Sequence, residues 1–119
     1  MEREFYDLAG VRIFHSVHSA ASEHEATELI NEAWNHQAQC VVIPAEEFGE
    51  DFWRLETRIA GGVFQKFVQY KMRLVILGDI SERTAASRSL RDFVYEVNRG
   101  NAIWFVSSRE ELESRLSAG

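Results

Sequence analysis

The chain has 119 residues and a formal net charge of −6, and 45% of its residues are hydrophobic. We therefore expect one domain over residues 1–119, large enough to bury a core without disulfide or metal cross-links. The negative charge argues against nonspecific binding to nucleic acid or to an anionic membrane. No signal peptide and no apolar run of the ~20 residues needed to span a membrane is visible. Together with the single cysteine, these features favour a cytoplasmic protein.

The N-terminal part of the chain predicts a hairpin followed by a helix. Residues 3–8 and 11–17 are typical of two short strands, and Gly10 lies in the tight turn between them. Ser22 and Glu25 have the spacing of a capping box that begins a helix. The apolar stripe of that helix consists of Ala26, Leu29, Ile30, Ala33 and Trp34.

The middle of the chain predicts a strand, an irregular segment and a second helix. Residues 39–44 are almost uniformly apolar, which is typical of a strand covered on both faces. Residues 45–56 are acidic but contain aromatic side chains, so we expect this segment to pack against the core. Thr57 is the expected N-cap of a helix that runs to residue 70. Its apolar stripe consists of Ile59, Ala60, Val63, Phe64, Phe67 and Val68.

The C-terminal part predicts two further strand and helix pairs. Residues 72–79 contain the clearest strand, and a helix is expected over residues 85–99. A last strand over residues 102–106 precedes a last helix over residues 107–116. Either of two serine and glutamate pairs can form the capping box of this helix, Ser107 with Glu110 or Ser108 with Glu111.

The resulting order, β-β-α-β-α-β-α-β-α, predicts an α/β fold with a single, mostly parallel sheet. Right-handed crossovers would connect its parallel strands, and the opening hairpin would add one antiparallel edge strand. The pattern leaves the order of the strands open. In such folds the carboxyl ends of the strands and the N-termini of the helices lie at one edge of the sheet, where ligands usually bind.

Three candidate ligand or regulatory residues belong to this carboxyl edge: Thr57, Asp79 and Ser81. Asp79 directly follows a buried strand, a common position for a catalytic or metal-binding acid, but it is equally suited to capping its own loop. Thr57 and Ser81 lie near helix starts, where a hydroxyl can assist anion binding or act as an N-cap.

Other reactive residues carry no recognisable pattern. The four histidines lack the spacing of a zinc site, and Cys40 is expected to be an inert core thiol. Gly61 and Gly62 interrupt a helix without matching a nucleotide-binding motif, which favours close packing inside the fold. We therefore expect no catalytic residue, no metal and no cofactor.

A charged flank follows the predicted third helix and offers structural or interaction candidates, namely Arg88, Asp92, Glu96 and Arg99, with Asn98 beside them. The flank is a solvated charge ladder, a polar docking surface, or a network that pins the end of the helix to its neighbours. Glu96 lies in the last turn, where the helix dipole disfavours a carboxylate. We expect it to be structural, paired with Arg99 or accepting backbone N–H groups. Tyr95 is also spaced to stack on Arg99.

Two segments resemble a known sequence pattern. "FWRLETRIAGGVFQKFVQYKMRLVILGDIS" and "LRDFVYEVNRGNAIWFV" are similar to an uncharacterised bacterial family, one of the domains of unknown function. The likeness covers residues 40–106, and this chain departs from the pattern at Arg58, Gly62 and Val63. A weaker, fold-level resemblance is to STAS domains of anti-sigma factor antagonists. That resemblance implies a regulatory hydroxyl at the start of the helix after the central strand, where Thr57 stands.

These observations predict a non-enzymatic, STAS-like regulatory or protein-interaction module. Its partner would be another protein or a second copy of the chain, as in a homodimer, with the contact surface around Thr57; we expect no nucleic acid or membrane partner. The alternative is a small enzyme or a domain binding a small ligand or anion, with Asp79, Ser81 and Thr57 at the carboxyl edge of the sheet.

Overall fold

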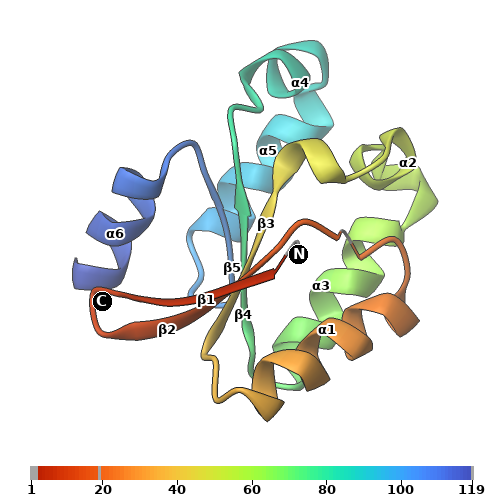
Figure 1. Cartoon of the computed structure of the whole chain (residues 1–119). Helices are drawn as coiled ribbons and strands as arrows, with labels where there is room; N and C mark the ends of the chain where they lie inside the picture. The colour runs from red at the N-terminus through yellow and green to blue at the C-terminus, as the bar shows by residue number, and fades with distance from the viewer. Residues whose placement is uncertain (1–2, 19, 119) are drawn as a thin grey trace.

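A computed structural model describes residues 3–18 and 20–118, and the strands of this part form one five-stranded sheet (Figure 1). The strands are β1 (Arg3–Leu8), β2 (Val11–Ser16), β3 (Cys40–Pro44), β4 (Arg73–Leu77) and β5 (Ile103–Val106). They lie side by side in the order of the sequence. β1 is antiparallel to β2, and the other neighbours are parallel. The predicted α/β class and the antiparallel edge strand are thus confirmed.

The order of the strands decides where the helices lie. The crossover helices are α1 (Glu23–Asn35), α3 (Ile59–Gln69) and α5 (Arg88–Asn98). From β2 to β5, the chain always moves to the neighbouring strand on the same side. Because crossovers between parallel strands are right-handed, all three helices then lie on one face of the sheet. Figure 1 shows α1, α3 and α5 on that face and α6 (Arg109–Ala118) on the other.

The core consists of two apolar layers because neighbouring strand residues point to opposite faces. On the face of α1, α3 and α5, the fully buried strand residues include Phe14, Val41 and Leu74. On the other face, Cys40 and Val42 belong to the layer that packs against Leu112 of α6. Both faces of the central strands are therefore buried, as their apolar sequences predict.

Two predicted elements differ from the structure. The irregular segment contains η1 (Ala45–Glu47), α2 (Glu50–Trp53) and η2 (Leu55–Thr57), and its aromatic side chains are buried as expected. The predicted helix over residues 85–99 is instead α5, preceded by a separate short helix, α4 (Ser81–Ala86). Ser87 divides them: its backbone is extended, and its hydroxyl oxygen accepts a hydrogen bond from Leu90 N, which makes it the N-cap of α5.

Two members of the predicted apolar stripes are exposed. Trp34 is 45% exposed and packs edge-on against Tyr70, with 5.5 Å between the ring centroids. Val68 is 53% exposed and lines open cavities near the end of α3. The helical period predicts which face of a helix is apolar. It does not predict how far along the helix that face is buried by the rest of the protein.

The adjacent glycines of α3 have different surroundings. A Cβ atom at Gly62 would lie 2.8 Å from Glu23 Oε2, so a side chain of α1 packs against this glycine. A Cβ atom at Gly61 would meet nothing within 4 Å. Of the two glycines, only Gly62 therefore has a neighbouring side chain in contact.

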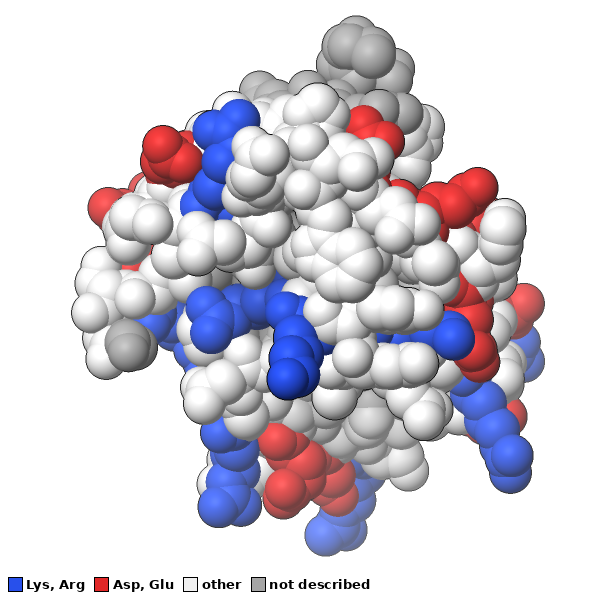
Figure 2. Space-filling view, turned by 90° about the horizontal axis from the view of Figure 1, so that it is seen from below, with Lys and Arg blue, Asp and Glu red and all other residues white. Residues whose placement is uncertain are grey.

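Lysine and arginine side chains gather at the end of the molecule where α1, α3 and α5 terminate (Figure 2). Arg12 Nε donates to His36 O, just beyond α1, at 3.0 Å. Arg115 Nη2 donates to Asn98 O, at the end of α5, at 2.7 Å. Because a helix C-terminus carries about half a negative charge, cations near these carbonyl groups stabilise the helices. The side chains of Arg12 and Arg115 therefore have a structural role.

The side chain of Asn98 covers part of the outer edge of β5. Its Nδ2 donates to Phe105 O at 3.2 Å, and its Oδ1 accepts from Phe105 N at 2.7 Å. The amide thus replaces a neighbouring strand at this position. Since unpaired strand edges invite pairing with other chains, the contact protects β5 while it holds α5 against the sheet.

Replacing Asn98 with alanine should destabilise the fold by about 2 kcal/mol, because Phe105 loses both partners of its partly buried amide and carbonyl groups. Urea denaturation measures this change. Asn101→Ala, which removes an exposed side chain from the following loop, is the control and should change stability by less than about 0.5 kcal/mol. Equal effects of the two substitutions would contradict the structural role of Asn98.

Candidate functional site

An open groove of about 410 Å³ lies at the carboxyl edge of the sheet, between the β4–α4 turn, α5 and the start of α6. Its apolar lining residues are Ile80, Val94, Phe105 and Val106. Its polar lining residues include Asp79, Ser81, Thr84, Arg91, Tyr95, Asn98, Ser107 and Glu111. The structure therefore brings together two of the predicted ligand residues, Asp79 and Ser81, and joins them to α5.

Asp79 and Ser81 form a local turn at the start of α4. Ser81 N donates to Asp79 Oδ1 at 2.9 Å. The hydrogen bonds from the backbone and hydroxyl group of Ser81 lower the pKa of the Asp79 carboxyl group below its ordinary value of 3.8. Asp79 is exposed and ionised at neutral pH, so it is poorly suited to donate a proton. Its geometry matches the capping alternative.

Glu111 occupies the opposite side of the groove and caps α6. Its Oε1 accepts hydrogen bonds from Ser107 N at 2.8 Å and from Ser107 Oγ at 2.9 Å. Ser108 Oγ in turn accepts from Glu111 N at 3.1 Å. Of the two predicted capping boxes, the pair Ser108 and Glu111 is therefore the one that forms.

The groove side of α5 is formed by Arg91, Tyr95 and Asn98, which are spaced i, i+4 and i+7. Tyr95 is 64% exposed, the largest exposure among the large hydrophobic residues that the structure describes. Arg91 forms no hydrogen bond or ion pair through its side chain with the described residues. Sequence reasoning missed Arg91 and Tyr95 as a pair, although their helical spacing with Asn98 was visible.

The predicted charged flank of α5 is mostly a solvated surface. Glu96 Oε2 lies 3.8 Å from Arg99 Nη1, so the expected pair forms. Both side chains are about two-thirds exposed, and such a pair contributes only a few tenths of a kcal/mol. The Arg99 guanidinium also lies 5.9 Å from the centre of the Tyr95 ring, as expected. Arg88 and Asp92 form no ion pair within the described part of the chain.

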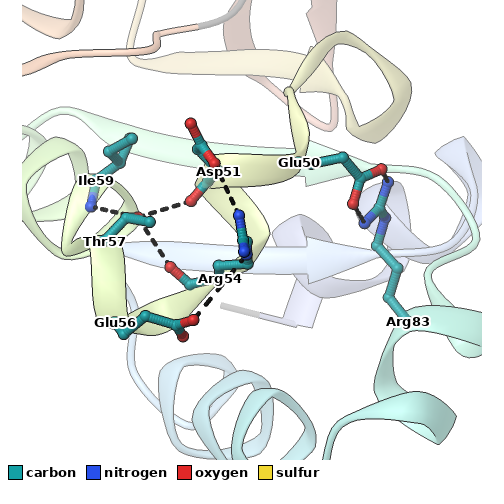
Figure 3. A network of polar contacts seen from close by, with 7 residues as sticks. All are labelled: Glu50, Asp51, Arg54, Glu56, Thr57, Ile59 and Arg83. Carbon is teal, nitrogen blue, oxygen red and sulfur yellow. Dashed lines mark hydrogen bonds and ion pairs between the residues drawn. The ribbon is translucent and has the colours of Figure 1, made fainter.

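Thr57 lies outside the groove and is engaged by its own segment (Figure 3). Its Oγ1 donates towards Asp51 O at 2.7 Å and Arg54 O at 2.8 Å, and accepts from Ile59 N at 3.3 Å. The prediction that Thr57 is the N-cap was wrong by one residue. Arg58 holds that position with a φ of 64°, because the preceding 3₁₀ turn ends in the left-handed conformation.

An arginine clamp connects α4 to α2 beside this segment (Figure 3). Arg83 donates two hydrogen bonds to the carboxylate of Glu50, at 3.1 and 3.0 Å. These bonds lower the pKa of Glu50 below its ordinary value. The guanidinium group also lies 4.9 Å from the centre of the buried Trp53 ring. The clamp links α2 to α4, whose Ser81 and Thr84 line the groove.

Within the described residues, no group of three or more histidine, cysteine or acidic side chains could hold a metal ion. Cys40 lies in the core, where burial raises the pKa of its thiol to about 12. No helix in the described part of the chain is long and apolar enough to cross a membrane.

Comparison with known families identifies the chain. A model described as "Domain of unknown function (DUF4180)" matches residues 9–116. The chain belongs to this family. The match confirms the predicted membership in a family of unknown function, and it includes the whole groove and the Asn98 contact. No match is found among curated proteins or solved structures.

Asp79→Asn should flatten the acid dependence of stability in this DUF4180 chain. A carboxyl group with a lowered native pKa stabilises the fold above its unfolded-state pKa, and this contribution disappears as the pH falls through the native pKa. Urea midpoints of both proteins at about pH 6 and about pH 3 measure the change. The difference between the proteins should shrink at the lower pH. Parallel pH curves would show that the Ser81 contact is not formed in solution.

Thr57→Val should lower stability by about 1 kcal/mol, because the isosteric side chain cannot replace the hydroxyl contacts of the 3₁₀ turn. Thermal or urea unfolding measures the loss. The matched control is Thr27→Val, which removes a single solvent-exposed hydroxyl contact to Glu23 O within α1 and should be nearly neutral. An equal loss in both variants would contradict the assigned role of Thr57.

Proposed function

We propose that this chain is a non-enzymatic regulatory module that binds a segment of another protein in the groove beside α5. The proposal rests mainly on one observation: exposed Tyr95 and Arg91, which has no side-chain partner among the described residues, line the same groove as apolar Ile80 and Val94. Tyrosine and arginine are enriched at the energetic centres of protein interfaces. We expect a surface without a binding role to combine tyrosine, arginine and a concave apolar surface less often.

The chemistry of the groove specifies the segment that would fit. Half-buried Ile80 and Val94 offer contact area to an apolar side chain. Arg91 can donate a forked pair of hydrogen bonds to a carboxylate. Asp79 and Glu111 are already engaged in helix capping, so they contribute charge but few open acceptor positions. We therefore propose a segment in which an apolar residue is followed or preceded by an acidic residue.

The enzyme alternative has less support from the same groove. Catalytic acids and bases usually have pKa values shifted towards neutrality, whereas the shift at Asp79 moves it away. The STAS-like resemblance is compatible with a regulatory module and remains a prediction. Thr57 no longer has a special place in the proposed contact surface, since its hydroxyl serves the turn before α3.

Peptides selected from a display library by the purified chain provide the test. A binding peptide containing an apolar and an acidic residue should perturb the backbone NMR signals of Ile80, Tyr95 and Val106. Tyr95→Ala and Arg91→Ala should each weaken its binding about tenfold or more. Arg88→Ala, a change of the same kind on the same helix but outside the groove, should leave affinity unchanged.

Three results would overturn the proposal. Signals could be perturbed away from the groove, or the Tyr95 and Arg91 variants could bind like the Arg88 variant. Sedimentation could also show a dimer that dissociates in Tyr95→Ala, which would assign the groove to a second copy of the chain.

A further inference from the structure

A second open cavity, of about 440 Å³, lies at the opposite edge of the sheet, where the helices end. It is bounded by the α3–β4 turn and by the loop between α5 and β5. This is the end of the molecule at which lysine and arginine side chains gather in Figure 2. The cavity shares no lining residue with the Tyr95 groove among the described residues, so the two are separate sites.

The charged residues that line this cavity are Lys71 and Arg73, and no carboxylate lines it within the described part of the chain. Arg73 is held in place: its Nε donates to Asn101 O at 2.9 Å, and its guanidinium group lies 4.4 Å from the centre of the Trp104 ring. The nearby ends of α3 and α5 each carry about half a negative charge. The two cations outweigh these partial charges, although the whole chain has a charge of −6.

The ammonium group of Lys71 has no structural role within the described part of the chain. The side chain is exposed, and it forms no hydrogen bond or ion pair with the residues that the structure describes. Its backbone adopts the left-handed conformation, with a φ of 57°. Met72 N donates to Phe67 O at 2.9 Å and Lys71 N to Val68 O at 3.1 Å, the pattern of a helix end that favours glycine at this residue. A glycine at this position would therefore keep the backbone conformation while it removes the ammonium group.

The remaining lining groups indicate the kind of anion that fits. Buried Phe67 and Met72, with exposed Val68, supply an apolar surface. Gln39 and Asn101 add side-chain amides, which can donate hydrogen bonds. We propose that this cavity binds a small organic anion, in which a carboxylate or phosphate group contacts Lys71 and Arg73 and an apolar body covers Val68 and Met72. A polyanion such as nucleic acid is disfavoured by the negative charge of the chain.

Phenyl phosphate is the probe that tests this site, with inorganic phosphate as the comparison. In an NMR titration, phenyl phosphate should perturb backbone signals of Gln39, of residues 71–73 and of Asn101. Inorganic phosphate should bind the same residues more weakly, because it lacks the apolar body. Lys71→Gly should weaken phenyl phosphate binding about tenfold or more. The same variant should be no less stable than the original chain, since glycine readily adopts the positive φ.

Gln37→Gly is the matched control. Gln37 also has a φ of 57° at the end of α1, but it does not line the cavity. This variant undergoes the same backbone change and should bind phenyl phosphate like the original chain. If Lys71→Gly fails to fold, Lys71→Asn takes its place, since asparagine also tolerates the left-handed conformation and is neutral.

The proposal is overturned if phenyl phosphate fails to bind at millimolar concentration, or if its perturbations fall at helix N-termini such as Ser81 and Ser108. It is equally overturned if Lys71→Gly or Lys71→Asn binds with unchanged affinity. Equal affinity for inorganic phosphate and phenyl phosphate would also overturn it. That result would show that the apolar body makes no contact with Val68 and Met72, and that the cavity is an unspecific cationic surface.

Discussion

The contact between the Asn98 amide and the backbone of Phe105 lies where α5, β5 and α6 meet. Asn98 is the last residue of α5, and through Phe105 it attaches that helix to the edge strand. The same residue lines the Tyr95 groove. Its carbonyl group accepts a hydrogen bond from Arg115, which ties α6 on the other face of the sheet to the same point. The loop that follows continues to Asn101, a lining residue of the second cavity.

The sequential order of the strands explains why the two ends of the molecule differ. It places α1, α3 and α5 on one face, with their N-termini at one edge and their C-termini at the other. At the first edge, the carboxylates of Asp79 and Glu111 accept hydrogen bonds from backbone N–H groups near helix starts. At the second edge, Arg12 and Arg115 bond to carbonyl groups at or beyond helix ends. Lys71 stands out there because it has no comparable structural partner among the described residues.

The strength of each signal in the sequence decided what could be predicted. Buried strands, helical stripes and the capping boxes follow from local physical rules, and they placed the main elements correctly. The break at Ser87 was missed because a capping serine looks like any polar residue within a helical pattern. Strand order depends on contacts between distant residues, which one sequence does not display.

The candidate site was only partly visible for the same reason. Asp79 and Ser81 are two residues apart in sequence, and their shared turn could be foreseen. The groove joins them to Arg91 and Tyr95, and this depends on how α5 packs against the edge of the sheet. The distinctive residues after Glu96 suggested a functional motif. In the structure, Asn98 organises the fold, while the exposed Glu96 and Arg99 pair contributes little.

Amide hydrogen exchange at Phe105 tests the central role of Asn98 most directly. Phe105 lies on the edge strand, yet its N–H donates to Asn98 Oδ1 at 2.7 Å, so its exchange should be slow. In Asn98→Ala it should become fast, while Leu74 N, which donates to Ala102 O at 2.9 Å, should remain protected. Fast exchange of Phe105 in the original chain, or unchanged protection in the variant, would contradict this account.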